Sequence, residues 1–153
     1  MCNRQYKSNA GAANNDPGHD GLPPRAETVR ADLERAFGSL SLGEFAPAGV
    51  STGHMTGSAH YEGRAIDVFF RPVDAGNRIR GWALAHFLVA NAARLHIQHV
   101  IYDKRIWSAG HESQSAWRPY TPPELTGNES PETLAILEHR DHVHDAVGRS
   151  DQE

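Results

Sequence analysis

The chain has only one cysteine, no long apolar run and no excess of basic residues. Its 153 residues include a single cysteine, Cys2, which excludes an internal disulfide and a cysteine-rich zinc cluster. The longest apolar stretches are shorter than the roughly 18 to 20 residues that a helix needs to span a bilayer. With 15 Lys and Arg against 19 Asp and Glu, the formal charge is −4, which argues against a nucleic-acid or anionic-membrane partner. Any metal must be held by imidazole and carboxylate groups.

The composition divides the chain into three parts. Residues 1–24 are rich in Asn, Gly, Ala and Pro and are predicted to form a disordered leader or linker. Residues 25–148 hold enough apolar material for one domain, and residues 149–153 form a polar tail. A signal or lipid anchor at Cys2 is compatible with the leader, and an incidental cysteine is an equally good explanation.

Hydrophobic periodicity predicts a mixture of helices and strands. The expected helices cover 26–38, 77–96 and about 130–137, and the expected strands cover 65–70, 96–102, 104–108 and 142–147, with a short strand near 45–50. Residues 110–130 are polar, Pro-containing and aromatic, which is typical of a long ordered loop that lines a site.

Ten histidines are the departure from ordinary composition, and several of them lie in two clusters with carboxylates. The first cluster, residues 58–67, reads S-A-H-Y-E-G-R-A-I-D, and the second, residues 139–144, reads H-R-D-H-V-H. Neutral imidazole and ionised carboxylate are the ligands of a catalytic zinc that keeps one position open for water. His142 and His144 are two residues apart, so a strand would present both on one face.

The two clusters resemble the zinc-binding signature of the Hedgehog/D-Ala-D-Ala-peptidase fold. The pattern S-x-H-x-x-G-x-A-x-D, followed downstream by D-H-x-H, carries this resemblance, and about residues 45–147 are similar to an actinobacterial extracellular cell-wall branch. The resemblance implies an α+β fold in which a small antiparallel sheet carries the zinc site and helices pack on its other face. It also implies Zn²⁺ as cofactor, peptidoglycan peptides as substrates and an extracellular or cell-wall location. We expect a monomer with no nucleic-acid partner and no transmembrane segment.

Carried over residue by residue, the resemblance assigns the centre of the site. His60, Asp67 and His144 match the three zinc ligands, and His142 matches a histidine beside the metal that handles protons. Asp141 has two possible roles. It matches the position of a general base, with a side chain one methylene shorter than the usual glutamate. On an ideal strand it faces away from His142, which makes it instead a partner that orients a histidine.

Four residues are candidates for substrate binding. They are His139, Ser58, Arg64 and Trp117. His139 matches a histidine that often precedes D-H-x-H. Ser58 is expected to hydrogen-bond its loop rather than act as a nucleophile, and arginine and tryptophan more commonly serve in ion pairs and core packing. Asp145, where the resembling proteins usually have a small residue, is expected to alter the rim of the site.

The leading functional prediction is a zinc peptidase that cleaves peptidoglycan stem peptides or cross-links through a metal-activated water. The alternative is a catalytically weak or inactive zinc-bearing module that binds the cell wall on the same fold. A third interpretation takes Asp141-His142-Val143 as the start of a ββα-metal nuclease. That motif needs a downstream Asn and His on a helix, and only nine residues follow His144.

Overall fold

A six-stranded antiparallel sheet organises the computed structural model, which describes residues 24–43, 52–110, 116–123 and 125–149. The predicted leader up to residue 23 and the strand expected near 45–50 lie outside these residues, and the three-part division of the chain stays a prediction. The elements, in chain order, are helix α1 Pro24–Phe37, strand β1 Leu42–Gly43, the 3₁₀ helix η1 Ala59–Glu62, β2 Ala65–Phe69, α2 Ala75–Ala90, α3 Ala92–Leu95, β3 Ile97–Tyr102, β4 Arg105–Ser108, β5 Arg118–Pro119, α4 Pro131–Leu137 and β6 His142–Val147.

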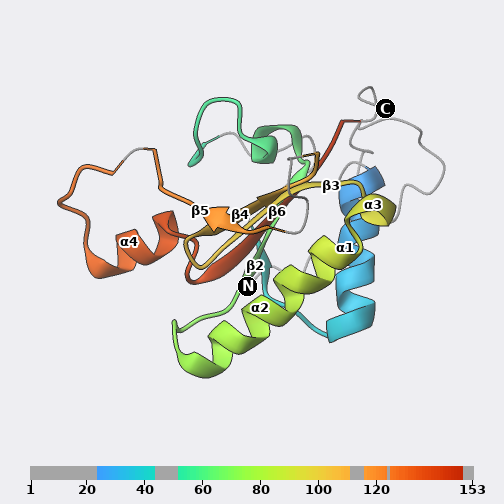
Figure 1. The fold of residues 1–153 in the computed structure, drawn as a ribbon, viewed down its shortest axis with the longest axis horizontal. Coiled ribbons are helices and arrows are strands. Elements are labelled where there is room, and N and C mark those ends of the chain that lie inside the picture. Colours follow the sequence, from blue (N-terminus) through green and yellow to red (C-terminus); the bar gives the residue numbers. More distant parts are fainter. Residues whose placement is uncertain (1–23, 44–51, 111–115, 124, 150–153) are drawn as a thin grey trace.

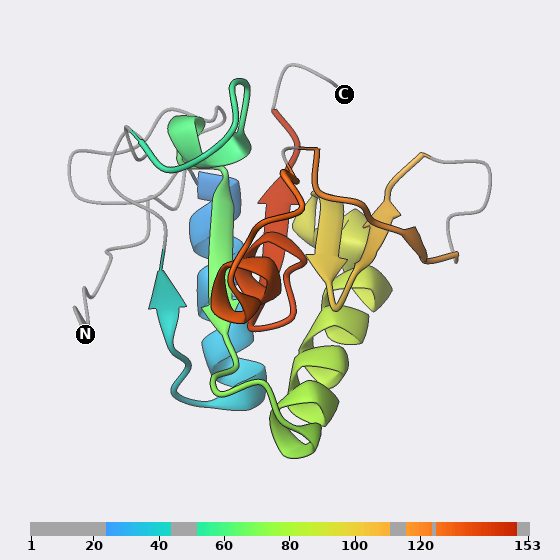
Figure 2. The ribbon, with the colours of Figure 1, turned by 90° about the vertical axis from the view of Figure 1, so that its left-hand side faces the viewer.

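The last strand of the chain lies in the middle of the sheet. The strand order is β1-β2-β6-β3-β4-β5, and every neighbouring pair is antiparallel. Helices α1 and α2 cover one face of the sheet, while α4 and the segment that carries η1 lie over the other (Figures 1 and 2). The α+β fold with a small antiparallel sheet, expected from the resemblance, is confirmed.

Alternation along β6 separates the core from the candidate site. Val143 and Val147 are fully buried and belong to the main hydrophobic core, which also includes Leu84 and Leu88 of α2. His142 and His144 project from the opposite face, because successive side chains of a strand point to opposite sides of the sheet. The hydrophobic core therefore lies between the sheet and α1 and α2, and the histidines lie on the face away from it.

The helix predicted over 77–96 is interrupted at Asn91. The Nδ2 group of Asn91 donates to the carbonyl oxygen of Phe87 at 2.8 Å, and the backbone N–H of Asn91 donates to the same oxygen at 3.1 Å. A side chain that competes for backbone groups in this way favours helix ends. The chain continues in the short α3 and stops at His96, whose φ of 56° is left-handed.

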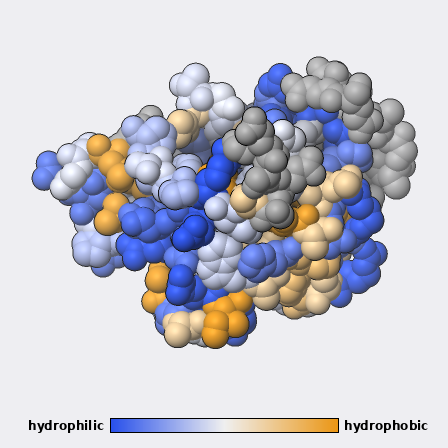
Figure 3. All heavy atoms as spheres, in the orientation of Figure 1, coloured by the Kyte–Doolittle hydropathy of each residue, from blue (hydrophilic) through white to orange (hydrophobic). Residues whose placement is uncertain are grey.

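The face seen in Figure 3 is hydrophilic over much of its area, and apolar side chains gather at its lower right, where α1 and α2 lie. Six large hydrophobic side chains among the described residues are exposed, and two of them, Met55 and Ile136, line the cleft described below. In the part of the chain that the structure describes, no helix combines the length and apolarity that crossing a membrane requires.

Asp145 lies in the core rather than at the rim of the site, because the alternation of β6 points it away from His144. Its strand neighbours are Ile66 and Val100, both fully buried. Its Oδ2 atom is buried and has no hydrogen-bond partner among the described residues. Burial, with a smaller contribution from the nearby charge of Asp67, raises the pKa of the Asp145 carboxyl well above its usual range.

We expect the substitution Asp145→Asn to stabilise the fold near neutral pH. The pKa of Asp145 is higher in the folded state than in the unfolded state, where it is about 4. The contribution of Asp145 to the free energy of unfolding is therefore fully present below about pH 4 and is lost as the pH rises through the folded-state pKa. The neutral amide removes this loss, which we estimate at about 1 to 3 kcal/mol. Urea unfolding of both proteins with chelator present, at pH 4 and pH 7, measures the effect. An equal advantage at both pH values would contradict the titration argument.

Candidate metal centre

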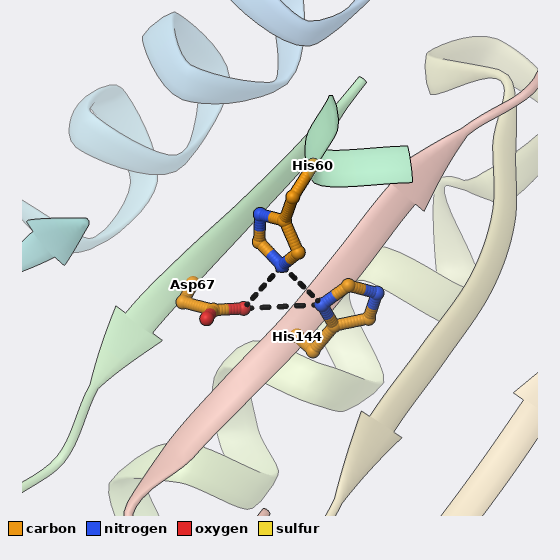
Figure 4. Close-up of side chains that lie close together, drawn as sticks. All are labelled: His60, Asp67 and His144. Carbon is orange, nitrogen blue, oxygen red and sulfur yellow. Dashed lines mark hydrogen bonds and ion pairs between the residues drawn. The ribbon is translucent and has the colours of Figure 1, made fainter. Parts of the chain in front are cut away.

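Three buried side chains converge on the sheet face away from the main core. The Nε2 atom of His60 lies 3.0 Å from Nδ1 of His144 and 3.3 Å from Oδ1 of Asp67. The distance between Nδ1 of His144 and Oδ1 of Asp67 is 3.1 Å. Figure 4 shows the three groups pointing toward one another. These three residues, called the metal group below, could together hold a metal ion.

The three residues come from two strands and one short helical turn. Asp67 of β2 and His144 of β6 are register partners, so the sheet itself places them side by side. His60 belongs to η1, whose N-cap is Ser58, and the Oγ atom of Ser58 accepts from the His60 N–H at 3.3 Å. Gly63 ends the turn with a left-handed φ of 68°, which lets the chain enter β2 at once.

The spacing of the three atoms fits a small tetrahedral cation. Zinc binds nitrogen and oxygen at about 2.0 to 2.2 Å, so two ligand atoms at tetrahedral corners lie roughly 3.3 to 3.6 Å apart. The observed separations of 3.0 to 3.3 Å come within a few tenths of an ångström of that range. Three protein ligands leave one position of the tetrahedron for water or substrate, which is the arrangement of catalytic zinc sites.

The electrostatics of the group favour the forms that bind metals. Burial alone raises the pKa of the Asp67 carboxyl, but the rings of His144 and His60 hold this pKa well below its usual range. Burial lowers the pKa of His144, although Asp67 opposes the change. An ionised carboxylate and a neutral imidazole are the ligand forms that bind divalent metals.

Asp141 and His142 form a pair beside this group. Oδ1 of Asp141 lies 2.7 Å from Nδ1 of His142, and Oδ2 of Asp141 accepts from Nε of Arg71 at 2.7 Å. The other ring nitrogen of His142, Nε2, lies 3.7 Å from Oδ2 of Asp67. Burial raises the pKa of Asp141, but His142 and Arg71 outweigh this and lower it overall. The pair therefore presents Nε2 of His142 to the metal group.

Asp141 contacts His142, although on an ideal strand its side chain would face away from that histidine. β6 begins at His142, so Asp141 lies just before the strand and is not bound by its alternation. The carbonyl oxygen of Asp141 accepts from the N–H of Phe70 at 2.8 Å, which fixes its backbone next to β2. Its carboxylate can then turn back to the neighbouring histidine.

A cleft of about 740 Å³ opens over the metal group. Residues 53–60 line one part of it, including Ser58. Apolar side chains outside that segment also line the cleft, and they are Phe69, Ile101, Ile106, Tyr120, Pro122, Pro123, Ile136 and Leu137. His139 also lines the cleft, with its ring 4.6 Å from that of His142 and 5.1 Å from that of Tyr120. Burial lowers the pKa of His139 to about 3, so this side chain is neutral.

Two residues predicted to bind substrate lie elsewhere. Arg64 is buried and donates to the carbonyl oxygen of Val147 and to the carboxylate of Glu62, so it ties η1 to the end of β6. Trp117 packs against Trp82, with ring centroids 4.9 Å apart, at the edge of the main core. Neither side chain is among the described residues that line the cleft, and each has a structural role instead.

Two further histidines, His54 and His99, lie at the site. The His54 ring stacks on His60 with a centroid separation of 3.9 Å and an interplanar angle of 15°. His99 contacts His144, and burial lowers the pKa of His99 to about 3. His99 lies in the strand predicted over 96–102. Only knowledge of the pairing of β3 with β6 could have placed it at the metal group.

Comparison with known proteins gives one family. The family model described as "VldE, C-terminal domain" matches residues 18–130, which is 113 of the 153 residues and includes His60 and Asp67. The match ends before β6, which carries His142 and His144. No curated protein and no solved structure matches the chain. The family description names no activity, but its match covers most of the sequence. The chain belongs to the VldE C-terminal domain family.

Proposed function

We propose that this protein is a zinc-dependent peptidase that hydrolyses amide bonds in the stem peptides or cross-links of peptidoglycan. The observation that carries the proposal is the convergence of His60, Asp67 and His144 at the cleft, next to a histidine that a carboxylate orients. A site with two imidazoles and one carboxylate suits zinc, and three protein ligands suit hydrolysis rather than a purely structural metal. The similarity of the motifs to peptidoglycan peptidases supports the choice of substrate.

A zinc ion at this site would acidify a water molecule and polarise the scissile carbonyl group. His142 is placed to accept the water proton at Nε2 and to pass a proton to the leaving amine, because its Nδ1 is occupied by Asp141. Asp141 holds the His142 ring in one tautomer and stabilises its protonated form, and Arg71 holds Asp141. Of the two roles open to Asp141, we propose that of orienting partner.

The cleft walls suit a peptide rather than a highly charged substrate. Arg71 is the only lysine or arginine that lines the cleft among the described residues, and it is already paired with Asp141. The apolar side chains described above can pack against aliphatic groups such as the methyl side chain of alanine. We propose that the protein works as a monomer on peptidoglycan peptides, outside the cell or at the cell wall.

Defined stem peptides, incubated with the purified protein and analysed by mass spectrometry, test the proposed reaction. We expect cleaved products that disappear with a chelator and return when Zn²⁺ is added back. The variant His60→Ala is the matched negative control, since it removes one proposed ligand from a turn outside the sheet. Products that are identical with and without chelator, and in the variant, would contradict a metal peptidase. Metal-dependent binding of peptidoglycan without cleavage would favour the alternative of a cell-wall-binding module.

A further inference from the structure

His144 has one ring nitrogen in the metal group and the other against a second histidine. Its Nδ1 lies 3.0 Å from Nε2 of His60 and 3.1 Å from Oδ1 of Asp67. Its Nε2 lies 3.1 Å from Nε2 of His99, and the two rings stack with centroids 5.2 Å apart and an interplanar angle of 16°. Both nitrogens of the proposed ligand are therefore engaged, each with a different neighbour.

The chemistry of imidazole assigns a direction to the contact between the two histidines. A neutral imidazole that binds a metal through Nδ1 carries its hydrogen on Nε2. The Nε2–H of His144 then donates to Nε2 of His99, which must be the unprotonated nitrogen of that ring. Partners of this kind fix the tautomer and the orientation of a ligating histidine and raise its basicity.

The backbone of β3 is built so that His99 reaches this position. Strict alternation would place Ile97 and His99 on the same face of the sheet. The pairing of β3 with β6 shifts register between these two residues, so that Ile97 lies opposite Val147 and His99 opposite Ala146. Ile97 is consequently buried in the main core, whereas His99 lines the cleft on the other face. Bulges re-aim side chains in this way and are frequent next to functional sites.

We propose that His99 is a positioning residue of the metal centre, which holds His144 in the tautomer and orientation that present Nδ1 to the ion. The inference rests on the proposed metal site and assigns to His99 a role that the sequence motifs do not contain. It predicts that metal affinity depends on a hydrogen-bond acceptor at position 99 and not only on the space that the ring fills.

Zinc affinity of the metal-free protein, measured by competition with a chromophoric chelator, tests this role without relying on catalysis. We expect His99→Phe, which keeps a ring but lacks the acceptor, to bind Zn²⁺ about 10- to 100-fold more weakly than the natural protein. His99→Gln, whose amide oxygen can accept the hydrogen bond, should retain most of the affinity. His86→Phe is the control, because His86 contacts Trp82 and Trp117 and does not line the cleft.

Three outcomes would overturn the proposal, and they are distinguishable. Equal zinc affinity of His99→Phe and the natural protein would show that the contact does not support the ligand. Equal weakening in His99→Phe and His99→Gln, with unfolding curves of the metal-free proteins unchanged, would assign the effect to ring packing. Failure of the natural protein itself to take up Zn²⁺ or Co²⁺ would remove the metal centre, and with it the proposed function.

Discussion

Replacing His60 with alanine should weaken zinc binding by about a hundredfold or more and strongly reduce metal-dependent stabilisation. Four-ligand structural zinc sites bind with about 10 to 16 kcal/mol, or roughly 2.5 to 4 kcal/mol for each ligand, which corresponds to about a hundredfold or more in affinity. His60 lies in η1, outside the sheet, whereas Asp67 and His144 lie on paired buried strands. Its removal should therefore affect the metal more than the fold.

Two measurements check this expectation. The first is zinc affinity, obtained by chelator competition. The second is the unfolding midpoint, compared with and without saturating Zn²⁺. A ligand that binds only the folded state stabilises it by about 4 kcal/mol at a thousand times its Kd. At one fixed zinc concentration, we expect a large rise of the midpoint in the natural protein and in His86→Ala, which replaces an exposed histidine of α2. The rise in His60→Ala should be much smaller, because the same zinc concentration is a smaller multiple of its Kd. A rise of equal size in His60→Ala would contradict its assignment as a ligand.

Replacing His142 with alanine should lower kcat by about 10² to 10⁴ while zinc affinity changes little. This is the usual contribution of a general acid–base group, and His142 neighbours the proposed ligands without being one of them. Asp141→Ala should also lower kcat, because it frees the His142 ring from its 2.7 Å partner. Since Asp141 acts through His142 in this scheme, the double variant should be no slower than His142→Ala alone.

The double-variant experiment separates the two roles open to Asp141. If Asp141 were the base itself, Asp141→Ala would lower kcat as much as His142→Ala or more. The double variant would then be slower than His142→Ala alone. Steady-state kinetics on one defined peptide, with zinc content verified for each protein, gives the comparison. Unfolding curves of the single variants show whether breaking the contact of Asp141 with Arg71 disturbs the fold.

Local sequence signals were sufficient for most elements that build the site. The run over 65–70 is rich in β-formers and ends before Pro72, and the structure has β2 there. Alternation over 142–147 corresponds to β6, with His142 and His144 on one face. Helix α4, predicted over about 130–137, begins after Ser130, whose Oγ accepts from the Thr133 N–H at 3.1 Å, and proline at the first helical position favours a helix start. These features depend on neighbours along the chain, and a single sequence contains that information.

Side-chain positions that depend on contacts between distant segments were not predictable in the same way. Arg64 and Trp117 carry groups suited to binding substrates, but the fold uses one to tie η1 to β6 and the other to pack on α2. The start of β6 at His142 frees Asp141 to contact its neighbour. Each outcome depends on where a strand begins or which segments meet, and the residue types are compatible with either result.

By itself, the sequence determined that a metal centre would have to use nitrogen and oxygen ligands, because the chain has no cysteine cluster, and the resemblance of its two motifs singled out His60, Asp67 and His144. It also predicted the two strands that carry Asp67 and His144, but the pairing of these strands comes from the tertiary structure. Only the tertiary structure decided that His99 joins them. A register shift in the pairing of β3 with β6 turns His99 toward His144, and such a shift arises from the fit of two strands that are far apart in sequence.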